Sequence, residues 1–220
     1  MSLAPFRTYA DTPRIAEFID AASRLIAQQG YDRTSVRDIA QAINLTSGTM
    51  FYHFKTKDDL LEAVISKGIN DGIAQMNEAL SRAGPGSLAR FLALVTAHIG
   101  VVHGELRHVH RVWIREWDRL SAEARLRLRP PAEQYRALLD NLLLALTEEG
   151  HLQTDPATAR HLLLPALNWT TAWADLPDER SRALLAEQLC AAILNTPVET
   201  FRSLLRKEAE RSRAEVRPAP

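Results

Sequence analysis

The run from Ser47 to His53 contains small and hydroxyl-bearing side chains, which are the types that can hydrogen-bond to a polyanion. It reads Ser-Gly-Thr-Met-Phe-Tyr-His. Glycine lets a backbone come close to a phosphate, and hydroxyl groups hydrogen-bond phosphate oxygens or base edges. The surrounding segment from Ile39 to Lys57 contains no acidic residue. These residue types therefore indicate a surface that can lie against a phosphate backbone.

The charge of the whole chain does not supply such binding. The 220 residues contain 27 Lys and Arg against 27 Asp and Glu, so the formal net charge at pH 7 is +0. A chain without net charge is not drawn to a nucleic acid as a whole. Any such contact must be made by a local surface.

Two short helices joined by a tight turn are expected to position the hydroxyl-rich run. Ser35 and Asp38 have the spacing of a capping box at the start of the first helix, and Thr46 stands at the N-cap of the second. Asn44 lies between them, where the turn needs a left-handed residue. The apolar residues expected to hold the pair together are Ile39, Ala40, Ile43, Leu45 and Met50. This arrangement is a helix-turn-helix pattern.

Helical spacing of apolar residues continues along the chain, and no segment has the alternation of a strand. A helix is expected to begin at Thr12-Pro13 and stop at Gly30, and another to run from the capping box of Thr56 and Asp59 to about Arg82. Later helices are expected at 88–102, 105–119, 132–149, 156–174, 178–194 and 197–213. We expect Pro165 to kink its helix or end it early.

The sequence thus predicts an all-α fold with two domains. A three-helix, helix-turn-helix domain is expected over residues 12–67, a second helical domain over 68–213 and a flexible tail over 214–220. The segment Gly84-Pro85-Gly86-Ser87 is the clearest break in the chain.

The first domain resembles the DNA-binding domain of the TetR family of bacterial transcriptional regulators, from about Arg14 to Lys67. The resemblance is carried by the ordered segments Thr34-Ser35, Ile39-Ala40, Ser47-Gly48-Thr49, Tyr52-His53-Phe54 and Lys57-Asp58-Asp59-Leu60. It implies a ligand-responsive, sequence-specific DNA-binding regulator, most often a repressor. It also implies an all-helical homodimer on a palindromic double-stranded DNA operator.

The same resemblance implies roles for individual residues. Thr46 would cap the recognition helix, Gly48 and Thr49 would approach the DNA, and Lys57 would meet a phosphate at the start of the next helix. The residues expected to bind DNA are Ser35, Arg37, Thr46, Ser47, Gly48, Thr49, Tyr52, His53 and Lys57. Two positions depart from the family pattern. Asn44 replaces the usual glycine, and Phe51 replaces a tyrosine, which leaves Phe51 either at the DNA or in the core.

The second domain more weakly resembles the ligand-sensing domains of a TetR branch that controls lipid and steroid catabolism. The resemblance is carried by residues 111–121, the Arg-rich stretch to Pro131, and residues 166–173. It implies a ligand-binding and dimerisation domain whose small-molecule effector could be an acyl-coenzyme A thioester. The residues expected to bind this effector are His103, His110, Arg111, Trp113, Trp117, Tyr135, Asn168 and Trp169. The alternatives are that the indoles are core and that Arg107, Arg111 and Arg115 form a solvated face.

The dimer is expected to form through the helices at 156–174 and 178–194. Leucines and isoleucine at helical spacing could build an apolar four-helix contact between two chains. These residues are Leu163, Leu167, Leu184, Leu185, Leu189 and Ile193. Pairing two helix-turn-helix elements on half-sites ~34–36 Å apart, or at a related spacing, would supply the affinity that one alone lacks.

Other classes are disfavoured by what the sequence lacks. It has no phosphate-binding glycine loop, nucleophile elbow or zinc-protease motif, so no enzyme and no cofactor are expected. The histidines His98, His103, His108 and His110 have poor spacing for a metal site. The apolar run from Phe91 to Val102 is too short to span a membrane, and the expected location is cytoplasmic. The alternative function is a helical lipid- or acyl-binding protein with an inert helix-turn-helix.

Overall fold

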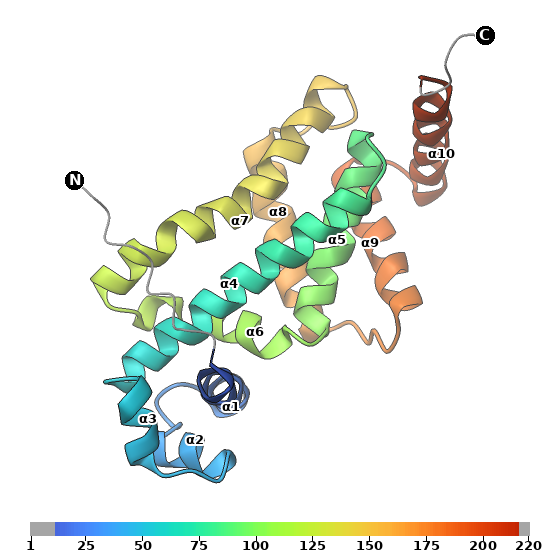
Figure 1. Ribbon diagram of the computed structural model, residues 1–220. Helices are drawn as coiled ribbons and strands as arrows, with labels where there is room; N and C mark the ends of the chain where they lie inside the picture. Colours follow the sequence, from blue (N-terminus) through green and yellow to red (C-terminus); the bar gives the residue numbers. More distant parts are fainter. Residues whose placement is uncertain (1–11, 216–220) are drawn as a thin grey trace. The chain divides into compact units, whose positions relative to one another are not determined.

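The computed structural model describes residues 12–215, which are almost entirely α-helical and contain no strand (Figure 1). The helices are α1 (Pro13–Gln29), α2 (Val36–Ala42), α3 (Ser47–His53), α4 (Lys57–Arg82), α5 (Ser87–His103), α6 (Arg107–Glu116), α7 (Ala122–Glu148), α8 (Pro156–Trp169), α9 (Glu179–Ile193) and α10 (Val198–Glu215). Single 3-10 turns, η1 (Trp117–Arg119) and η2 (Thr170–Ala172), follow α6 and α8. The predicted all-α fold is confirmed.

The described chain divides into two compact units, each of which combines distant segments. The first contains residues 12–72 and 105–133, and the second contains residues 73–104 and the chain from 134 onward. The predicted domains place 105–133 with the second domain, whereas these residues pack with the first unit. The reason is that α1 packs against α6 as well as α2, which no local pattern reveals. The predicted boundary after residue 67 stays a prediction.

Helix starts in the first unit follow the predicted capping chemistry. The Ser35 hydroxyl accepts from the Asp38 amide at 3.1 Å, and the Asp38 carboxylate accepts from the Ser35 amide at 2.9 Å. Thr56 and Asp59 make the same reciprocal pair, at 3.0 Å in each direction. Asn44 has a φ of 57°, so the predicted left-handed turn is confirmed.

Thr46 is at the N-cap of α3 but does not cap it with its side chain. Its hydroxyl lies 3.2 Å from the hydroxyl of Thr49 and makes no capping bond to the backbone. The predicted side-chain cap is therefore wrong, because the two hydroxyls hydrogen-bond to each other. Both groups are consequently positioned together at the start of α3.

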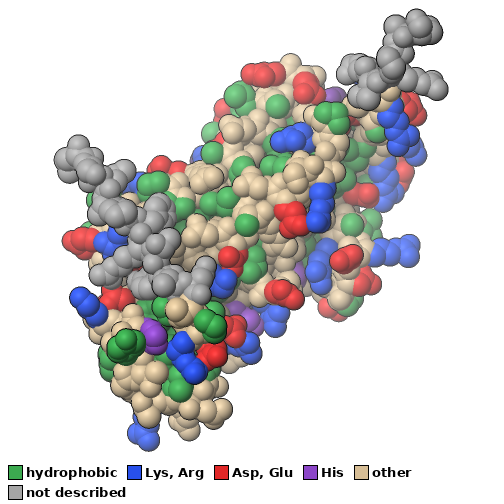
Figure 2. All heavy atoms as spheres, viewed as in Figure 1, with side chains coloured by type: hydrophobic (Ala, Val, Ile, Leu, Met, Phe, Trp, Pro, Cys, Tyr) green, Lys and Arg blue, Asp and Glu red, His purple; other side chains and the backbone are tan. Residues whose placement is uncertain are grey.

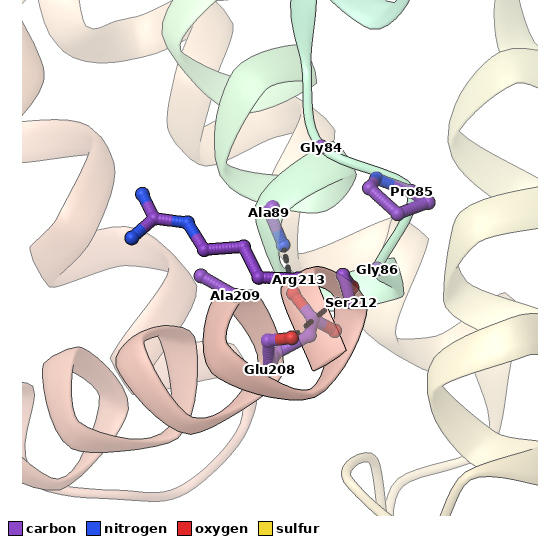
Figure 3. A pocket seen from close by; sticks show the side chains of 8 residues that line it. All are labelled: Gly84, Pro85, Gly86, Ala89, Glu208, Ala209, Ser212 and Arg213. Atoms are coloured by element: carbon purple, nitrogen blue, oxygen red, sulfur yellow. Dashed lines mark hydrogen bonds between the residues drawn. The ribbon is translucent and has the colours of Figure 1, made fainter. Parts of the chain in front are cut away.

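The second unit is built around α5, which packs against α8, α9 and α10. Its buried face includes Phe91, Val95 and Ile99, each at 0% exposure. Cys190 of α9 is also fully buried, and burial raises the pKa of its thiol well above the usual range. The carboxylate of Glu208, from α10, accepts from the backbone amides of Leu88 (3.0 Å) and Ala89 (2.9 Å) at the start of α5. Figure 3 shows Glu208 beside Ala89.

Three prolines lie inside helices, and those of α7 contradict the predicted start of that helix. α7 begins at Ala122 instead of residue 132 and passes through Pro130 and Pro131. α8 continues through Pro165, as its predicted range did, but ends at Trp169, before the predicted end at residue 174. A proline removes one backbone donor and crowds the preceding turn, but burial of a helical face can outweigh that cost. The buried residues on both sides of these prolines are Leu128, Ala132, Tyr135 and Leu139 in α7, and Leu163 and Leu167 in α8.

The C-terminal end is more ordered than expected. The predicted tail begins at residue 214, yet α10 includes residues 214 and 215. The remainder of the predicted tail, 216–220, lies outside the described residues. Within 12–215, no single helix is long and apolar enough to cross a membrane. Only the consecutive helical segments Ser87–His103 and Arg107–Arg119, taken together, reach the required length and composition.

Candidate nucleic-acid interface

The helix α3 presents its small and hydroxyl-bearing side chains outward while a few apolar residues anchor it. Met50 is fully buried, whereas Gly48 is exposed and Tyr52 is 86% exposed. The end of the molecule where Figure 1 places α2 and α3 shows mainly tan and green atoms in Figure 2, with little acidic surface. The geometry therefore agrees with the chemistry expected from the acid-free segment.

The three ring-bearing residues at the end of α3 differ in their surroundings. His53 lies against Phe18 of α1, with ring centroids 6.1 Å apart, and against Tyr52, with centroids 5.1 Å apart. Phe51 is 50% exposed, so the alternative that placed it in the core is wrong. Phe51 and Tyr52 together make an exposed aromatic surface on α3.

The predicted DNA-binding residues all lie in the first unit, on α2, α3 and the ends next to them. The exposed members are Ser35, Arg37, Thr46, Gly48 and Tyr52. The half-buried members are Ser47, Thr49, His53 and Lys57. They form one contiguous part of the chain, and their contact with DNA stays a prediction.

Lys57 is held by a neighbouring residue instead of pointing freely into solvent. Its Nζ donates to the carbonyl of Tyr31 at 2.5 Å and lies 3.8 Å from the centroid of the Tyr31 ring. Burial lowers the pKa of this ammonium. Lys55, two residues earlier in the loop between α3 and α4, is exposed. Lys55 was not among the predicted DNA-binding residues, although a lysine inside the acid-free segment is a usable signal for a phosphate contact.

Tyr31 belongs to a network that joins the loop after α1 to the end of α6. Arg119 of η1 donates to Asp32 through both ends of its guanidinium, at 2.7 Å for Nη1, and its Nε lies 3.0 Å from Glu116. Glu116 accepts from the backbone amide of Tyr31 at 3.4 Å. The Tyr31 hydroxyl donates to Asp58 at the start of α4. Burial, followed by this hydrogen bond, raises the pKa of the phenol, so it stays a donor.

An ion pair with a buried carboxylate fixes α7 to α4 inside the first unit. Arg127 donates to both carboxylate oxygens of Glu62, at 2.8 and 2.6 Å. Glu62 is only 5% exposed. A buried charge needs such a partner, because an unpaired carboxylate in the core is strongly destabilising. The start of α7 is thus tied to α4, the helix that follows α3.

The predicted effector residues fall into both units. His110, Arg111, Trp113 and Trp117 lie in the first unit, where the rings of His110 and Trp113 meet edge to face with centroids 5.6 Å apart. Trp113 is only 9% exposed and packs in the core of its unit, as the alternative held. Arg111 is exposed, and Trp117 is half-buried.

In the second unit, Tyr135 and Asn168 are linked by His98, which was not among the predicted effector-binding residues. The His98 ring lies 3.2 Å from the Tyr135 hydroxyl through Nδ1 and 2.9 Å from Asn168 Oδ1 through Nε2. His98 and Tyr135 are 1% and 4% exposed. His103 Nε2 lies at hydrogen-bond distance, 2.8 Å, from the hydroxyl of Thr170. Within 12–215, no group of three His, Cys, Asp or Glu side chains is placed to hold a metal ion.

The indoles of Trp169 and Trp173 are 65% and 58% exposed, so they are not core residues. By contrast, Leu163, Leu167 and Leu185 are buried within one chain and are not available for the predicted contact between two chains. These leucines were predicted from their helical spacing. The same spacing places them on the faces of α8 and α9 that are buried inside their own unit. The exposed large apolar residues in the described part of the second unit are Leu144, Leu162, Trp169, Trp173 and Leu184.

Comparison with protein-family models gives two matches that agree with this architecture. Residues 18–64 match the model of bacterial regulatory proteins of the tetR family. Residues 84–196 match a tetracyclin repressor-like C-terminal domain, and this match alone spans more than half of the chain. The chain belongs to the TetR family. It is a DNA-binding transcriptional regulator and not an enzyme.

Two curated relatives of this TetR-family protein are similar over most of the chain. The fatty acid metabolism regulator protein of Bacillus subtilis (strain 168) is 24% identical over 164 residues, covering 73% of this chain and 84% of the relative. The HTH-type transcriptional repressor KstR2 of Rhodococcus jostii (strain RHA1) is 28% identical over 149 residues, covering 67% and 72%. These relatives support the predicted resemblance to a branch that regulates lipid and steroid metabolism.

A solved structure shares the fold. The crystal structure of AibR in complex with isovaleryl coenzyme A and operator DNA has a TM-score of 0.74 and 20% identity, with 84% of this chain and 100% of that chain covered. At that identity the likeness concerns the fold alone.

Proposed function

We propose that this TetR-family regulator is a homodimeric repressor that binds a palindromic operator through α2 and α3. An acyl-coenzyme A thioester, or a related amphipathic acyl compound, would release it. The observation that carries the DNA-binding part is the outward face of α3, where Tyr52 is 86% exposed on an acid-free segment. A regulator that reads a bacterial chromosome would work in the cytoplasm.

The geometry of α3 suits a recognition helix. Gly48 and Thr49 near its start allow close approach to the DNA, and the N-terminal residues of such helices contact base edges in the major groove. The exposed Tyr52 hydroxyl can reach a base edge or a phosphate. Ser35 and Arg37 on α2 would contact the backbone and fix the orientation of the helix pair.

The proposal for the effector class is supported by the relatives and by a buried polar group. One relative is named for fatty acid metabolism, and AibR was crystallised with an acyl-coenzyme A. In the second unit, Tyr135, His98 and Asn168 form a hydrogen-bonded row inside an otherwise apolar interior. A few convergent polar groups in apolar surroundings are typical of small-molecule sites, where they orient a carbonyl or hydroxyl.

Release of the operator requires that the effector favour one conformation. A ligand with ~100-fold higher affinity for the non-binding conformation would shift the equilibrium by about 2.7 kcal/mol. α4 is a single helix from Lys57 to Arg82, so a displacement of its C-terminal half would reach the start of the helix next to α3. The network of Arg119, Asp32 and Tyr31 would couple α6 to the same point.

The dimer would use the large apolar residues that one chain leaves exposed on α8 and α9. Leu184, already in the predicted set, stays available for this role, and Leu162 and Trp169 take the place of the buried leucines. An interface rich in exposed aromatic and aliphatic side chains is typical of homodimers. Two α3 helices would then meet the two halves of a palindrome.

The test is operator binding followed by effector titration. An operator selected from random DNA would be labelled, and its anisotropy followed with the wild type and with Tyr52→Ala and Thr49→Ala. We expect both variants to lose affinity and to alter base preference, whereas Gln153→Ala in the second unit changes neither. A panel of acyl-coenzyme A thioesters and free acids would then be added.

Two outcomes would contradict the proposal. Failure to select any preferred DNA sequence, combined with retained binding of acyl compounds, would favour the alternative of a helical acyl-binding protein with an inert helix-turn-helix. Operator binding that no member of the acyl panel weakens would remove the effector class but leave the DNA-binding function. Tyr135→Phe and Asn168→Ala should weaken the effector response without changing operator affinity.

A further inference from the structure

A groove in the second unit has features that the operator-binding function does not use. It is bordered by α4, α5, α9 and α10 and has a volume of about 720 Å³. Its floor is made mainly of alanines, which leave space that larger side chains would fill. These alanines include Ala89, Ala93 and Ala97 of α5, with Ala79 of α4 and Ala183 of α9.

One end of the groove contains two buried polar atoms without partners. Gln75 Oε1 and Arg182 Nε are buried, and neither makes a hydrogen bond within the described part of the chain. Gln75 lies over Gly100 of α5, where an added methyl group would be 3.5 Å from its Nε2. The pKa of His103, one turn further along α5, is lowered by burial and then by the charge of Arg182. Both side chains therefore lie near the C-terminal turns of α5.

The charged residues of the groove differ in how they are used. Glu78 and Arg82 form an ion pair at 2.5 Å and neutralise each other. Glu179 also lines the groove, and Arg182 has no carboxylate within ion-pair distance among residues 12–215. A buried guanidinium nitrogen without an acceptor is costly, so this end of the groove favours an anionic oxygen.

The other end is apolar. From Gly100 back to Ala89 the groove follows α5 for eleven residues, which at a rise of 1.5 Å per residue is ~16 Å. It ends near Gly84 and Ala89, which Figure 3 shows beside α10. A ligand that fits must therefore combine an acceptor head with an extended apolar body.

We propose that this groove is a second small-molecule site that binds an amphipathic carboxylate. The carboxylate accepts from Arg182, and the alkyl chain lies on the alanines of α5. A hydroxyl near the carboxylate would donate to Gln75 Oε1 and add affinity. This site is separate from the Tyr135, His98 and Asn168 row, and it does not depend on the chain binding an operator.

The experiment measures binding directly, without DNA. Dodecanoate and 3-hydroxydodecanoate would be titrated by calorimetry below their micellar concentrations, and a photoreactive dodecanoate would locate the site by mass spectrometry. We expect labelling on α4, α5, α9 or α10. Arg182→Gln should weaken dodecanoate by roughly tenfold or more, because a hydrogen bond to a charged group is lost. Arg180→Gln, on the exposed side of α9, is the matched control and should bind like the wild type.

Two further variants separate the parts of the proposal. Ala93→Phe should fill the groove and abolish binding, with circular dichroism confirming its fold. Gln75→Leu should remove the advantage of the hydroxylated acid but not the binding of dodecanoate. The proposal is overturned if dodecan-1-ol binds as tightly as dodecanoate, if Arg182→Gln has no effect, or if the label lies elsewhere. It is also overturned if Ala93→Phe alters the oligomeric state and leaves affinity unchanged, because the groove would then be a contact between chains.

Discussion

The contact between Lys57 and Tyr31 changes the expected distribution of phosphate contacts along the DNA-binding segment. The Lys57 ammonium already has a carbonyl acceptor and an aromatic ring. Because it would have to give up both interactions, its net gain in binding free energy from a phosphate would be smaller. Among residues 12–215, Lys55 makes no such competing contact, and it is exposed in the loop that follows α3. At the scale of single residues, Lys55 is therefore the better candidate for a phosphate.

We predict that Lys55→Ala weakens binding to all DNA sequences about equally. Loss of one phosphate contact should reduce the slope of log affinity against log salt by ~0.9. Lys57→Ala should leave this slope almost unchanged. Anisotropy titrations at several salt concentrations make the measurement. A reduced slope for Lys57→Ala alone would instead show that its ammonium leaves Tyr31 when DNA binds, as the family resemblance implies.

We predict that His103 contributes to the pH dependence of the free energy of unfolding. Burial and the charge of Arg182 lower the pKa of His103 in the folded state, so the unfolded chain binds its proton more readily. The free energy of unfolding should therefore be highest above the unfolded pKa of about 6.5 and should fall as the pH drops below it. His103→Gln, which can still bond Thr170, should flatten this loss. Urea unfolding at pH 7.5 and 5.5 tests it, and identical pH dependence in both proteins would contradict it.

At the scale of helices, α5 depends on a cap supplied by a distant element. Its N-cap position is Gly86, which has no side chain to satisfy the first amides. Glu208 of α10 supplies the acceptors instead, and Figure 3 shows its contact with Ala89. A negative charge at a helix N-terminus is also favoured by the helix dipole. The last helix thus stabilises the start of the central one.

We predict that Glu208→Ala lowers the free energy of unfolding by roughly 1–2 kcal/mol, the range for losing a cap or a charged hydrogen bond. The control is Glu210→Ala, two residues along the same helix and exposed, which should change stability by less than about 0.5 kcal/mol. Chemical denaturation followed by circular dichroism gives both values. Equal stability of the two variants would show that water replaces the carboxylate.

The helices that the sequence predicts best are those with local start signals. Ser35 with Asp38, and Thr56 with Asp59, mark the starts of α2 and α4 through neighbours three residues away. The start of α7 could not be predicted, because Pro130 and Pro131 resemble a stop unless the burial around them is known. The Glu208 cap could not be predicted either, since its partners lie about 120 positions earlier.

The candidate site shows the same division between local and distant information. The hydroxyl face of α3 follows from spacing within seven residues, so it was predictable. The contact of Lys57 with Tyr31 joins the start of α4 to the loop after α1, and neither this contact nor the exposure of Phe51 is determined by spacing. His98 was considered only as a metal ligand, because its partners Tyr135 and Asn168 come from other helices.

At the scale of the whole molecule, the proposed function depends on a second chain. The exposed large apolar residues of α8 and α9 would be unusual on a monomer, since large exposed apolar patches mark interaction surfaces. Pairing through them would place two α3 helices on one operator. The dimer and the operator affinity should therefore be lost together.

We predict that Leu162→Glu converts the dimer into a monomer at micromolar concentration and weakens operator binding in parallel. Leu126→Glu is the matched control, because Leu126 is 58% exposed and Leu162 is 60% exposed, yet Leu126 lies on α7 in the first unit. Sedimentation velocity and anisotropy measure the two properties. A monomeric wild type, or a Leu162→Glu dimer, would contradict the proposed interface.

The burial of Cys190 has a practical consequence for measuring the distance between the α2 helices of two paired chains. A thiol with no exposed surface and a raised pKa forms little thiolate and is out of reach of maleimides and other probes. A single cysteine introduced at the exposed Gln41 of α2 would therefore accept a fluorophore selectively in the native protein, with Cys190 left in place. Energy transfer between donor- and acceptor-labelled chains would then report the distance between the two DNA-reading heads, with and without operator or effector.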